Sequence, residues 1–306
     1  MIFFIIYFMI SKDISVVGSI ALDSLKTSKG NRENIIGGSA MYFTVSASIF
    51  SNVEVIGIVG TDFPELGWEI LNKKNINKKN ITIEDGKTFS WGGKYSDDYS
   101  TRDTLFTDLG VFENYNPKIE SSINQNGTLF LANIQPQLQL NVLNQLKDNI
   151  SLVVSDTMNL WIDTDLDGLN DVISKSNIFL LNDEEATQLT GCSDLLEAGK
   201  YLMKEGPSTV IIKMGSKGSL LLDENGSFHV PCVPNIDVYD PTGAGDSFAG
   251  GFIGFISQFG LDNKKLALAY ASAIASYTVS DFGINKLLNL NLDAVKARVK
   301  IIEDLM

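Results

Sequence analysis

The stretch from Asp240 to Asp246 reads Asp-Pro-Thr-Gly-Ala-Gly-Asp, and the chain continues as Ser-Phe-Ala-Gly-Gly-Phe. Gly243 to Gly245 are small enough for backbone N–H groups to approach an anion closely. The apolar run after them predicts a buried helix, which would place these amides at its positive N-terminal end. A carboxylate at Asp246 is then suited to accept a proton from an attacking hydroxyl. The alternative is a glycine-rich turn with Asp246 as an ordinary N-cap.

This stretch resembles the signature of the ribokinase-like (PfkB) carbohydrate kinase family. That family phosphorylates a hydroxymethyl group of a sugar or nucleoside with ATP and Mg²⁺. The resemblance implies that Asp246 is the catalytic base and that Gly243, Ala244 and Gly245, with the Asp246 amide, form an anion hole. It extends over roughly residues 14–304. It implies an α/β, ribokinase-like three-layer fold with a mostly parallel central sheet and a small β lid, and it leaves open a monovalent cation as a further cofactor.

Further segments fit the same resemblance. Gly37 and Gly38, followed by Ser-Ala, resemble the family's di-glycine at the sugar site, and would let the backbone approach a ligand closely. Asp23 follows the first predicted strand, where open α/β sheets bind ligands and where the family holds sugar hydroxyls with an aspartate. One carboxylate can accept hydrogen bonds from two vicinal hydroxyls. A loop-capping Asp23 is the alternative.

Composition narrows the function classes. A chain of 306 residues suits one large α/β domain, and the net charge of −13 argues against a nucleic-acid or anionic-membrane partner. Cys192 and Cys232 lie far apart, which indicates reduced thiols and a cytoplasmic protein. A single histidine, His229, excludes histidine-rich metal sites and argues against a Ser-His-Asp triad.

The first ten residues are intensely apolar, but a membrane span needs about 20. No basic region precedes them and no small-residue cleavage site follows. We therefore interpret residues 1–8 as a dispensable extension, with Met9 as a natural alternative start and residues 9–306 as a single kinase domain. A membrane-associating tail is the alternative.

Apolar, β-branched runs alternate with helical patterns along the rest of the chain. Strands are expected at 14–20, 53–59, 128–132, 151–154, 178–181, 209–213 and 219–222. Helices are expected at 39–50, 136–147, 183–190, 194–204, 247–259, 263–280 and 292–304. This alternation predicts a mostly parallel sheet covered on both faces.

Residues 81–116 are rich in Thr, Ser, Tyr, Gly and Asp, and alternate in polarity around 88–95, which predicts exposed antiparallel strands. In the family that the chain resembles, a small β lid covers the sugar, and residues 24–34 and 81–116 correspond to it. Closure of a lid would keep water away from the γ-phosphate. A surface hairpin without a gating role is the alternative, and the resemblance leaves open a homodimer formed through the lid.

The chain departs from the family at the substrate site. Ribokinases and many fructokinases carry an asparagine four residues after the second glycine, and here that position is Tyr42. The family's Asp-x-Asn-x-Arg run is only partly present at residues 156–159, without the arginine. Ribose and fructose are therefore poor default substrates. Tyr42 and Trp91 could stack on a base or wall off a smaller polyol, or could be packing aromatics.

The nucleotide is expected at two turns that follow strands. Asn182 and Glu185 match the family's Asn-x-x-Glu element, which implies that they hold Mg²⁺ through its waters; capping of a helix explains them equally well. The run from Lys213 through Gly215 and Ser216 to Gly218 resembles the family's turn near the ATP phosphates and ribose, and could also be a hairpin turn. Neither a Walker A loop nor a Rossmann glycine pattern is present.

These observations predict an ATP-dependent kinase that phosphorylates a primary hydroxyl of a sugar or sugar-like small molecule. A nucleoside kinase of the same fold is the second interpretation, because Tyr42 and Trp91 permit it. A catalytically silent, ligand-sensing member of the fold is the third, although the intact Gly-Ala-Gly-Asp argues against it. A nicotinamide dehydrogenase is the most distant alternative.

Overall fold

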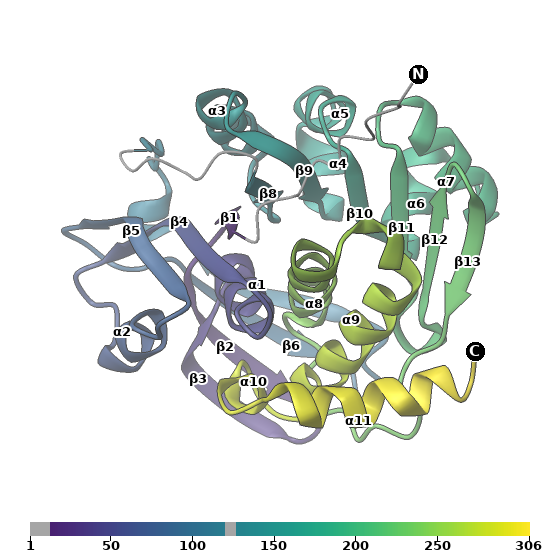
Figure 1. The fold of residues 1–306 in the computed structure, drawn as a ribbon. Coiled ribbons are helices and arrows are strands. Elements are labelled where there is room, and N and C mark those ends of the chain that lie inside the picture. Colours follow the sequence, from purple (N-terminus) through teal and green to yellow (C-terminus); the bar gives the residue numbers. More distant parts are fainter. Residues whose placement is uncertain (1–12, 120–126) are drawn as a thin grey trace.

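The computed structural model describes residues 13–119 and 127–306, which contain one large and one small β-sheet (Figure 1). The large sheet has the strand order β13-β12-β11-β10-β9-β8-β1-β4-β5, and neighbouring strands run parallel except at the β11–β12 and β12–β13 pairs. Its strands are β1 (Asp13–Val17), β4 (Asn52–Gly60), β5 (Ile76–Glu84), β8 (Gly127–Leu131), β9 (Ile150–Asp156), β10 (Ile178–Asn182), β11 (Thr209–Lys213), β12 (Ser219–Asp223) and β13 (Gly226–Val230). The predicted mostly parallel sheet is confirmed.

Helices cover both faces of this sheet (Figure 1). One face carries α1 (Ser39–Ala47), α8 (Ala244–Phe259), α9 (Lys264–Thr278), α10 (Asn285–Leu288) and α11 (Leu292–Glu303). The other carries α3 (Pro136–Leu146), α4 (Asn159–Thr164), α5 (Leu166–Ser174), α6 (Asp183–Thr190) and α7 (Leu195–Lys204), while α2 (Glu65–Leu71) packs beside β5. In the described part of the chain, no helix is both long enough and apolar enough to cross a membrane.

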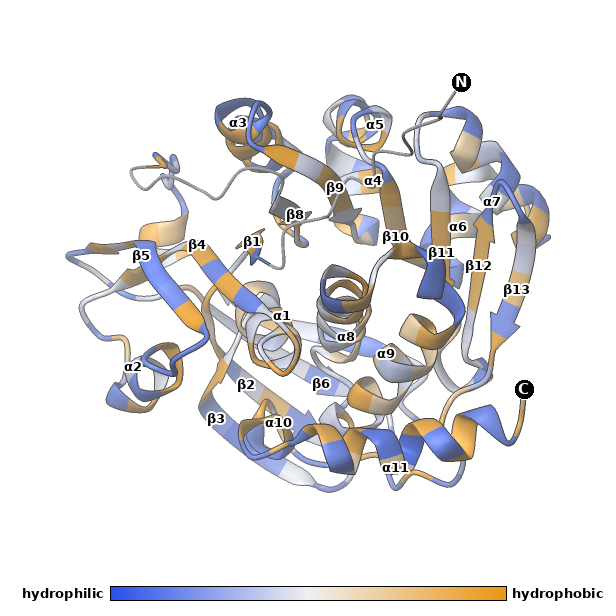
Figure 2. Cartoon of the chain, in the orientation of Figure 1, coloured by the Kyte–Doolittle hydropathy of each residue, from blue (hydrophilic) through white to orange (hydrophobic). Residues whose placement is uncertain are grey.

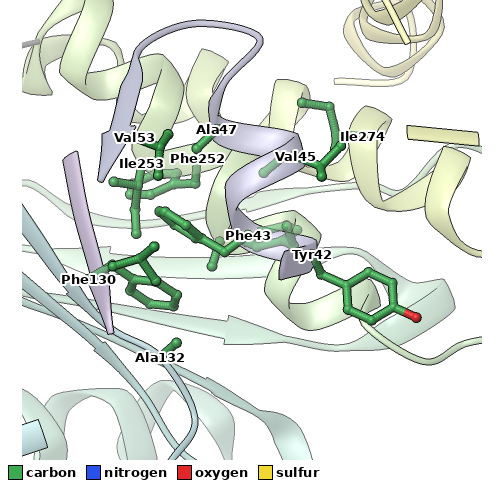
Figure 3. Close-up of a cluster of buried hydrophobic side chains, with 14 of the residues drawn as sticks. Tyr42, Phe43, Val45, Ala47, Val53, Phe130, Ala132, Phe252, Ile253 and Ile274 are labelled. Carbon is green, nitrogen blue, oxygen red and sulfur yellow. The ribbon is translucent and has the colours of Figure 1, made fainter. Parts of the chain in front are cut away.

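The large sheet has a hydrophobic core on each of its faces. Successive side chains of a strand point to opposite faces, so alternate residues of the central strands pack into one core or the other. Leu180 of β10 joins the cluster under α1, α8 and α9, whereas Leu181 joins the cluster under α5 to α7. Strands buried on both faces therefore read as continuous apolar runs, visible as orange segments in Figure 2. In Figure 3, Phe43 of α1 stacks on Phe130 of β8, with ring centroids 4.4 Å apart.

The glycines of α8 allow its neighbours to approach it backbone to backbone. A Cβ atom at Gly250 would lie 2.6 Å from the carbonyl oxygen of Phe43 in α1, and one at Gly251 would lie 2.9 Å from the Cα of Ala271 in α9. Side chains at these positions would push the helices apart. Helix α8 thus packs closely between α1 and α9, and this packing fixes the position of its N-terminus.

The smaller sheet has the order β3-β2-β6-β7 and is built from β2 (Ala21–Thr27), β3 (Gly30–Gly37), β6 (Ser90–Tyr95) and β7 (Arg102–Asp108). It joins the two early segments that the sequence assigned to a lid. Its hairpins are antiparallel, as expected, but the central β2–β6 pair is parallel. Residues 81–84 lie outside it, because the alternating Ile81 and Ile83 complete β5 at the edge of the large sheet.

Several predicted bounds differ from the observed ones. The first strand was expected to run to Ile20 but ends at Val17, since Gly18 to Ile20 connect β1 to β2 in the other sheet. The helix expected at 39–50 ends at Ala47. Helices α2, α4, α5 and α10 were not predicted. The extension assigned to residues 1–8 lies outside the described residues.

Candidate active site

Helix α8 begins at the glycine turn, with Gly243 as its N-cap at φ 73°. The predicted helix start at residue 247 was three residues late, so Asp246 is the third residue of the helix and not its N-cap. The Ala244 N–H donates to the Pro241 carbonyl at 3.2 Å, which leaves the next amides of the first turn to face outward. An unsatisfied first turn at the positive end of a helix is suited to bind an anion.

Gly243 lies directly on the ring of Tyr42. A Cβ atom at Gly243 would fall 2.3 Å from the Tyr42 Cδ1, so a side chain is excluded both by space and by the left-handed backbone. Tyr42 is 1% exposed, and its hydroxyl has no hydrogen-bond partner among the described residues. Figure 3 shows this ring leaving the apolar cluster at the start of α1, with the hydroxyl pointing away from the cluster. Tyr42 therefore supports the glycine turn and presents an unpaired polar atom.

Asp246 is half-buried at the start of α8. Burial and the negative charge of Asp156 raise the pKa of its carboxyl to about 7, against the opposing effect of the Lys213 ammonium. A carboxylate with a pKa near neutrality can exchange a proton with a substrate hydroxyl at physiological pH.

Asp23 lies in β2 and is 3% exposed. Its carboxylate packs on Gly37, where a Cβ atom would lie 1.9 Å from Oδ2, and it accepts a hydrogen bond from the Gly38 amide. Gly37 thus makes room for this carboxylate, and a Cβ atom at Gly38 would lie 2.4 Å from the Ser19 carbonyl oxygen. Burial, followed by the charges of Asp240 and Asp246, raises the pKa of Asp23 to about 8.

Trp91 of β6 is the register partner of Asp23 in the parallel β2–β6 pair. Residues paired in this way point to the same face of a sheet, so both side chains belong to one face of the smaller sheet. The indole extends over Gly93, where a Cβ atom would lie 2.1 Å from the Trp91 Cη2. The Arg102 guanidinium lies 5.1 Å from the centroid of the indole. Tyr95, four residues after Trp91 in the same strand, reaches the glycine turn, because its hydroxyl lies 2.9 Å from that of Thr242.

Asn182 and Glu185 form a reciprocal capping box at the start of α6. The Asn182 Oδ1 accepts from the Glu185 N–H, and the Glu185 Oε2 accepts from the Asn182 N–H, both at 2.7 Å. Glu185 is buried, and burial in particular raises its pKa to about 7, with Lys213 acting in the opposite direction. The capping alternative is therefore observed, and the carboxyl lies close enough to Lys213 to interact with it electrostatically.

The four residues expected at the nucleotide divide into two groups. Lys213 ends β11 and binds Asp156, with its Nζ 2.6 Å from Oδ2. Gly215 and Ser216 lie in a 3-10 turn, and Gly218 ends that turn before the antiparallel strand β12, with its carbonyl bonded to the Met214 N–H at 2.8 Å. The hairpin alternative thus describes this turn correctly, while Lys213 faces the start of α8.

Three residues that lie at this site in the structure have no role in the sequence prediction. In the sequence, Asp156 belongs only to an incomplete motif, and Thr242 and Tyr95 carry no predicted role in the site. Asp156 does carry a usable signal, because it is an acidic residue that ends a buried strand at the carboxyl edge of the sheet. The Tyr95–Thr242 contact joins residues 147 positions apart, and no local pattern announces it.

Carboxylates and one lysine therefore meet a helix N-terminus at the carboxyl edge of a parallel sheet, beneath a smaller sheet. The profile of the pfkB family carbohydrate kinases matches residues 11–289 of this chain. The chain belongs to the PfkB family. The predictions of that family, of its three-layer fold with a β lid, and of a kinase that acts on a sugar or sugar-like molecule are confirmed.

Individual PfkB relatives agree with this assignment. The cytidine kinase of Thermococcus kodakarensis is 30% identical over 254 residues, which cover 80% of this chain and 89% of that protein. The crystal structure of the Methanocaldococcus jannaschii nucleoside kinase superposes with a TM-score of 0.76 at 24% identity, covering 94% of this chain and 98% of that one. The Salmonella enterica aminoimidazole riboside kinase, solved with aminoimidazole riboside and an ATP analogue, has a TM-score of 0.75 at 19% identity over 94% and 99% of the two chains.

Proposed function

We propose that this PfkB kinase phosphorylates the primary hydroxyl of a ribonucleoside with ATP. The observation that carries the proposal is the pairing of Asp23 with Trp91 on one face of the smaller sheet. A carboxylate can accept hydrogen bonds from the two vicinal hydroxyls of a ribose, and an adjacent indole offers a flat surface to a base. The similarity to a cytidine kinase, which covers 80% of this chain and 89% of that protein, supports the same substrate class.

Asp246 is the proposed catalytic base, and the amides of Gly243, Ala244, Gly245 and Asp246 are the proposed anion hole. Because the Ala244 N–H is already bonded to Pro241 and the Asp246 amide interacts with its own carboxyl, the Gly245 amide is the donor best placed for a phosphate. Asp23, Gly37, Gly38 and Tyr42 are the proposed acceptor site.

ATP is the proposed donor, with Lys213, Gly215, Ser216 and Gly218 at its phosphates and ribose. Asn182 and Glu185 are suited to hold Mg²⁺ through water, because the capping box uses only the Oε2 of Glu185 and Mg²⁺ retains its waters readily. A bound Mg²⁺ would neutralise charge on the transferred phosphates.

A free sugar is the second candidate acceptor, because Asp23 could hold the vicinal hydroxyls of any small polyol. Tyr42 weighs against it, since the ring occupies the position of a sugar-binding asparagine in the ribokinases that the sequence resembles.

A pooled acceptor assay with ATP and Mg²⁺ separates these candidates. We expect turnover with cytidine, uridine or adenosine, with kcat/KM at least about tenfold above that for ribose and fructose. The variant Trp91→Ala should reduce kcat/KM for the nucleoside by about 10–100-fold and leave that for ribose nearly unchanged, since stacking on a base contributes about 1–3 kcal/mol. Preference for a free sugar would support the second candidate, and ATP binding without turnover of any acceptor would contradict the proposal.

Two further family-like properties are proposals as well. The same assay in K⁺ and in a bulky organic cation tests for a monovalent-cation requirement. A homodimer through the lid is supported by β7, an edge strand exposed along its whole length, on which Leu105 is 46% and Phe106 43% exposed. Sedimentation equilibrium of the wild type and of Phe106→Lys would test it, and a wild-type monomer at all concentrations would contradict it.

A further inference from the structure

Lys213 and Asp156 form an ion pair at the carboxyl edge of the large sheet. The Lys213 Nζ lies 2.6 Å from Oδ2 and 2.9 Å from Oδ1 of Asp156. Lys213 ends β11 and Asp156 ends β9, so the pair bridges the end of β10, the strand between them. The exposed fractions of the two side chains are 16% and 4%. Burying an ion pair gives little net stability, so stability alone is a weak reason for this arrangement.

The ammonium also lies against the first turn of α8. A Cβ atom at Gly245 would fall 3.3 Å from the Lys213 Nζ. Gly245 is the second residue of the helix, in the turn whose amides face outward. A point positive charge and a helix N-terminus therefore converge on one small region, where each favours an anion.

Lys213 is surrounded by carboxylates. Burial lowers the pKa of its ammonium, but the charges of Asp156, Glu185 and Asp246 outweigh burial, and the pKa lies above its ordinary value. The group is therefore cationic at neutral pH. Two of its three N–H bonds are directed at the two oxygens of Asp156, which fixes the ammonium in one place and leaves a third donor for another oxygen.

We propose that Lys213 is a catalytic residue that stabilises the transferring phosphoryl group, and that Asp156 is a positioning residue that holds the Lys213 ammonium over the start of α8. The proposal rests on the kinase function proposed above. In the transfer, the acceptor oxygen forms a bond to the γ-phosphorus, and the bond from that phosphorus to the β–γ bridging oxygen breaks. The electron pair of the broken bond stays on the bridging oxygen of ADP, and the acceptor proton passes to Asp246. Lys213 faces the oxygens on which negative charge then lies.

The chain offers a matched control for the loss of a buried ion pair. Lys264 pairs with Asp223, with exposed side-chain fractions of 20% and 3% that nearly equal those of the proposed catalytic pair. Asp223 is the register partner of Thr209, the first residue of β11, whereas Lys213 is the last. The control pair thus lies at the opposite end of the same strand.

The test compares Lys213→Met, Asp156→Asn, the double variant and Lys264→Met. Calorimetry gives the affinities for ADP and for a non-hydrolysable ATP analogue with Mg²⁺, and kinetics give kcat and KM. We expect Lys213→Met to lower kcat by about 10²–10³-fold. The loss of binding affinity should be at least about tenfold larger for the ATP analogue than for ADP. Asp156→Asn should lower kcat by about tenfold, and the double variant should be no slower than Lys213→Met, because Asp156 acts through Lys213. Lys264→Met should lower the melting temperature and leave kcat unchanged.

Three results would overturn the proposal: a folded Lys213→Met protein with kcat within about threefold of wild type, equal losses of affinity for ADP and the ATP analogue, or a double variant whose loss of kcat is the product of the two single losses. If Lys213→Met does not fold, Asp156→Asn decides, since an unchanged kcat in that variant removes the positioning role. If the wild type transfers phosphate to no acceptor, the proposed function fails, and the difference between the ADP and ATP-analogue affinities still tests whether Lys213 contacts the γ-phosphate.

Discussion

The hydroxyl of Tyr95 in the lid lies 2.9 Å from the hydroxyl of Thr242, the residue that precedes the glycine turn of α8. A second lid residue holds the same segment, since the Tyr99 hydroxyl donates to the Val238 carbonyl at 2.9 Å. Lys29, at the tip of the β2–β3 hairpin, pairs with Asp237 at 2.7 Å. Both hairpins of the smaller sheet therefore contact residues 237–242, the segment that leads into the proposed anion hole, so side-chain contacts link the smaller sheet to that segment.

The first prediction concerns this link. Tyr95→Phe removes one hydrogen bond of about 1 kcal/mol and should lower kcat by about 3–10-fold, because the glycine turn is less firmly held, while ADP affinity changes little. Steady-state kinetics and calorimetry measure the two quantities. Tyr201→Phe, which alters a hydroxyl on the exposed surface of α7, is the control. A kcat for Tyr95→Phe equal to that of the control would show that the hydroxyl contact has no bearing on turnover.

The second prediction concerns the base. Asp246→Asn keeps the shape of the side chain but removes its ability to take a proton, so turnover should fall by about 10²–10⁴-fold with ATP affinity retained. The exposed Asp262→Asn, which makes the same chemical change outside the site, should behave as wild type. Single-turnover kinetics at saturating ATP would measure the effect. Activity within a few-fold of wild type would rule out Asp246 as the base.

The third prediction follows from the pKa values of Asp23 and Asp246, which burial and charge raise from 3.8 to about 8 and about 7. At pH values between 3.8 and these raised pKa values, the two carboxyls bind more protons in the folded protein than in the unfolded chain. Their contribution to the free energy of unfolding therefore falls as the pH rises through this range. Asp23→Asn and Asp246→Asn should therefore be stabilising relative to wild type at about pH 9, and much less so at about pH 4.

Urea denaturation of the unliganded proteins at the two pH values measures this difference. In kinetics, the proposed function requires both carboxyls to be ionised, so their pKa values of about 8 and about 7 predict that kcat/KM falls as pH decreases below about 8, and more steeply below about 7. Equal stabilisation at both pH values would mean that the carboxyls are not shifted in the folded state.

The sequence was most informative where a local pattern determines local structure. The glycine turn and the apolar run after it predicted the position of α8 to within one turn, and the buried strands were recognised because parallel strands covered on both faces are uniformly apolar. The capping box at Asn182 was likewise readable from four residues.

The missed features depend on contacts between distant segments. Lys213 pairs with Asp156 because β9, β10 and β11 are neighbours in the sheet. The order of strands in a sheet cannot be predicted from the sequence of any single strand. Helices α4 and α5 follow Asp156 in a stretch rich in Asp and Asn, whose weak helix propensity is overcome by packing of Ile162 and Leu169. The sequence predicts that Asp23 and Gly37 belong to the same site, but it does not predict that the Asp23 carboxylate packs directly on Gly37.

The fourth prediction concerns the amino terminus. A chain that begins at Met9 should be as active as the full chain and at least as soluble, because residues 1–8 form an uncharged, β-prone segment. Kinetics and light scattering of the two proteins measure this. Loss of folding on removal of residues 1–8 would show that this segment belongs to the core.

The last prediction concerns substrate choice and rests on Tyr42. Its ring supports Gly243, while its buried hydroxyl has no partner among the described residues. We expect an acceptor hydroxyl to reach this atom when the substrate binds. An unpaired polar group in a binding site discriminates strongly in favour of a ligand that pairs with it. Tyr42→Phe keeps the ring and should lower kcat/KM for the preferred acceptor by about 5–30-fold with little change in the KM for ATP.

Tyr42→Asn removes the ring as well and introduces an amide that can serve two sugar hydroxyls. We expect ribose to be a weak substrate of the wild type, and the ratio of kcat/KM for ribose to that for adenosine to rise in Tyr42→Asn by more than the KM for ATP changes. Measuring both parameters with ribose, fructose and adenosine on the three proteins decides the matter. Efficient phosphorylation of ribose by the wild type, unaltered in both variants, would show that Tyr42 lies outside the acceptor site and serves only to support the glycine turn.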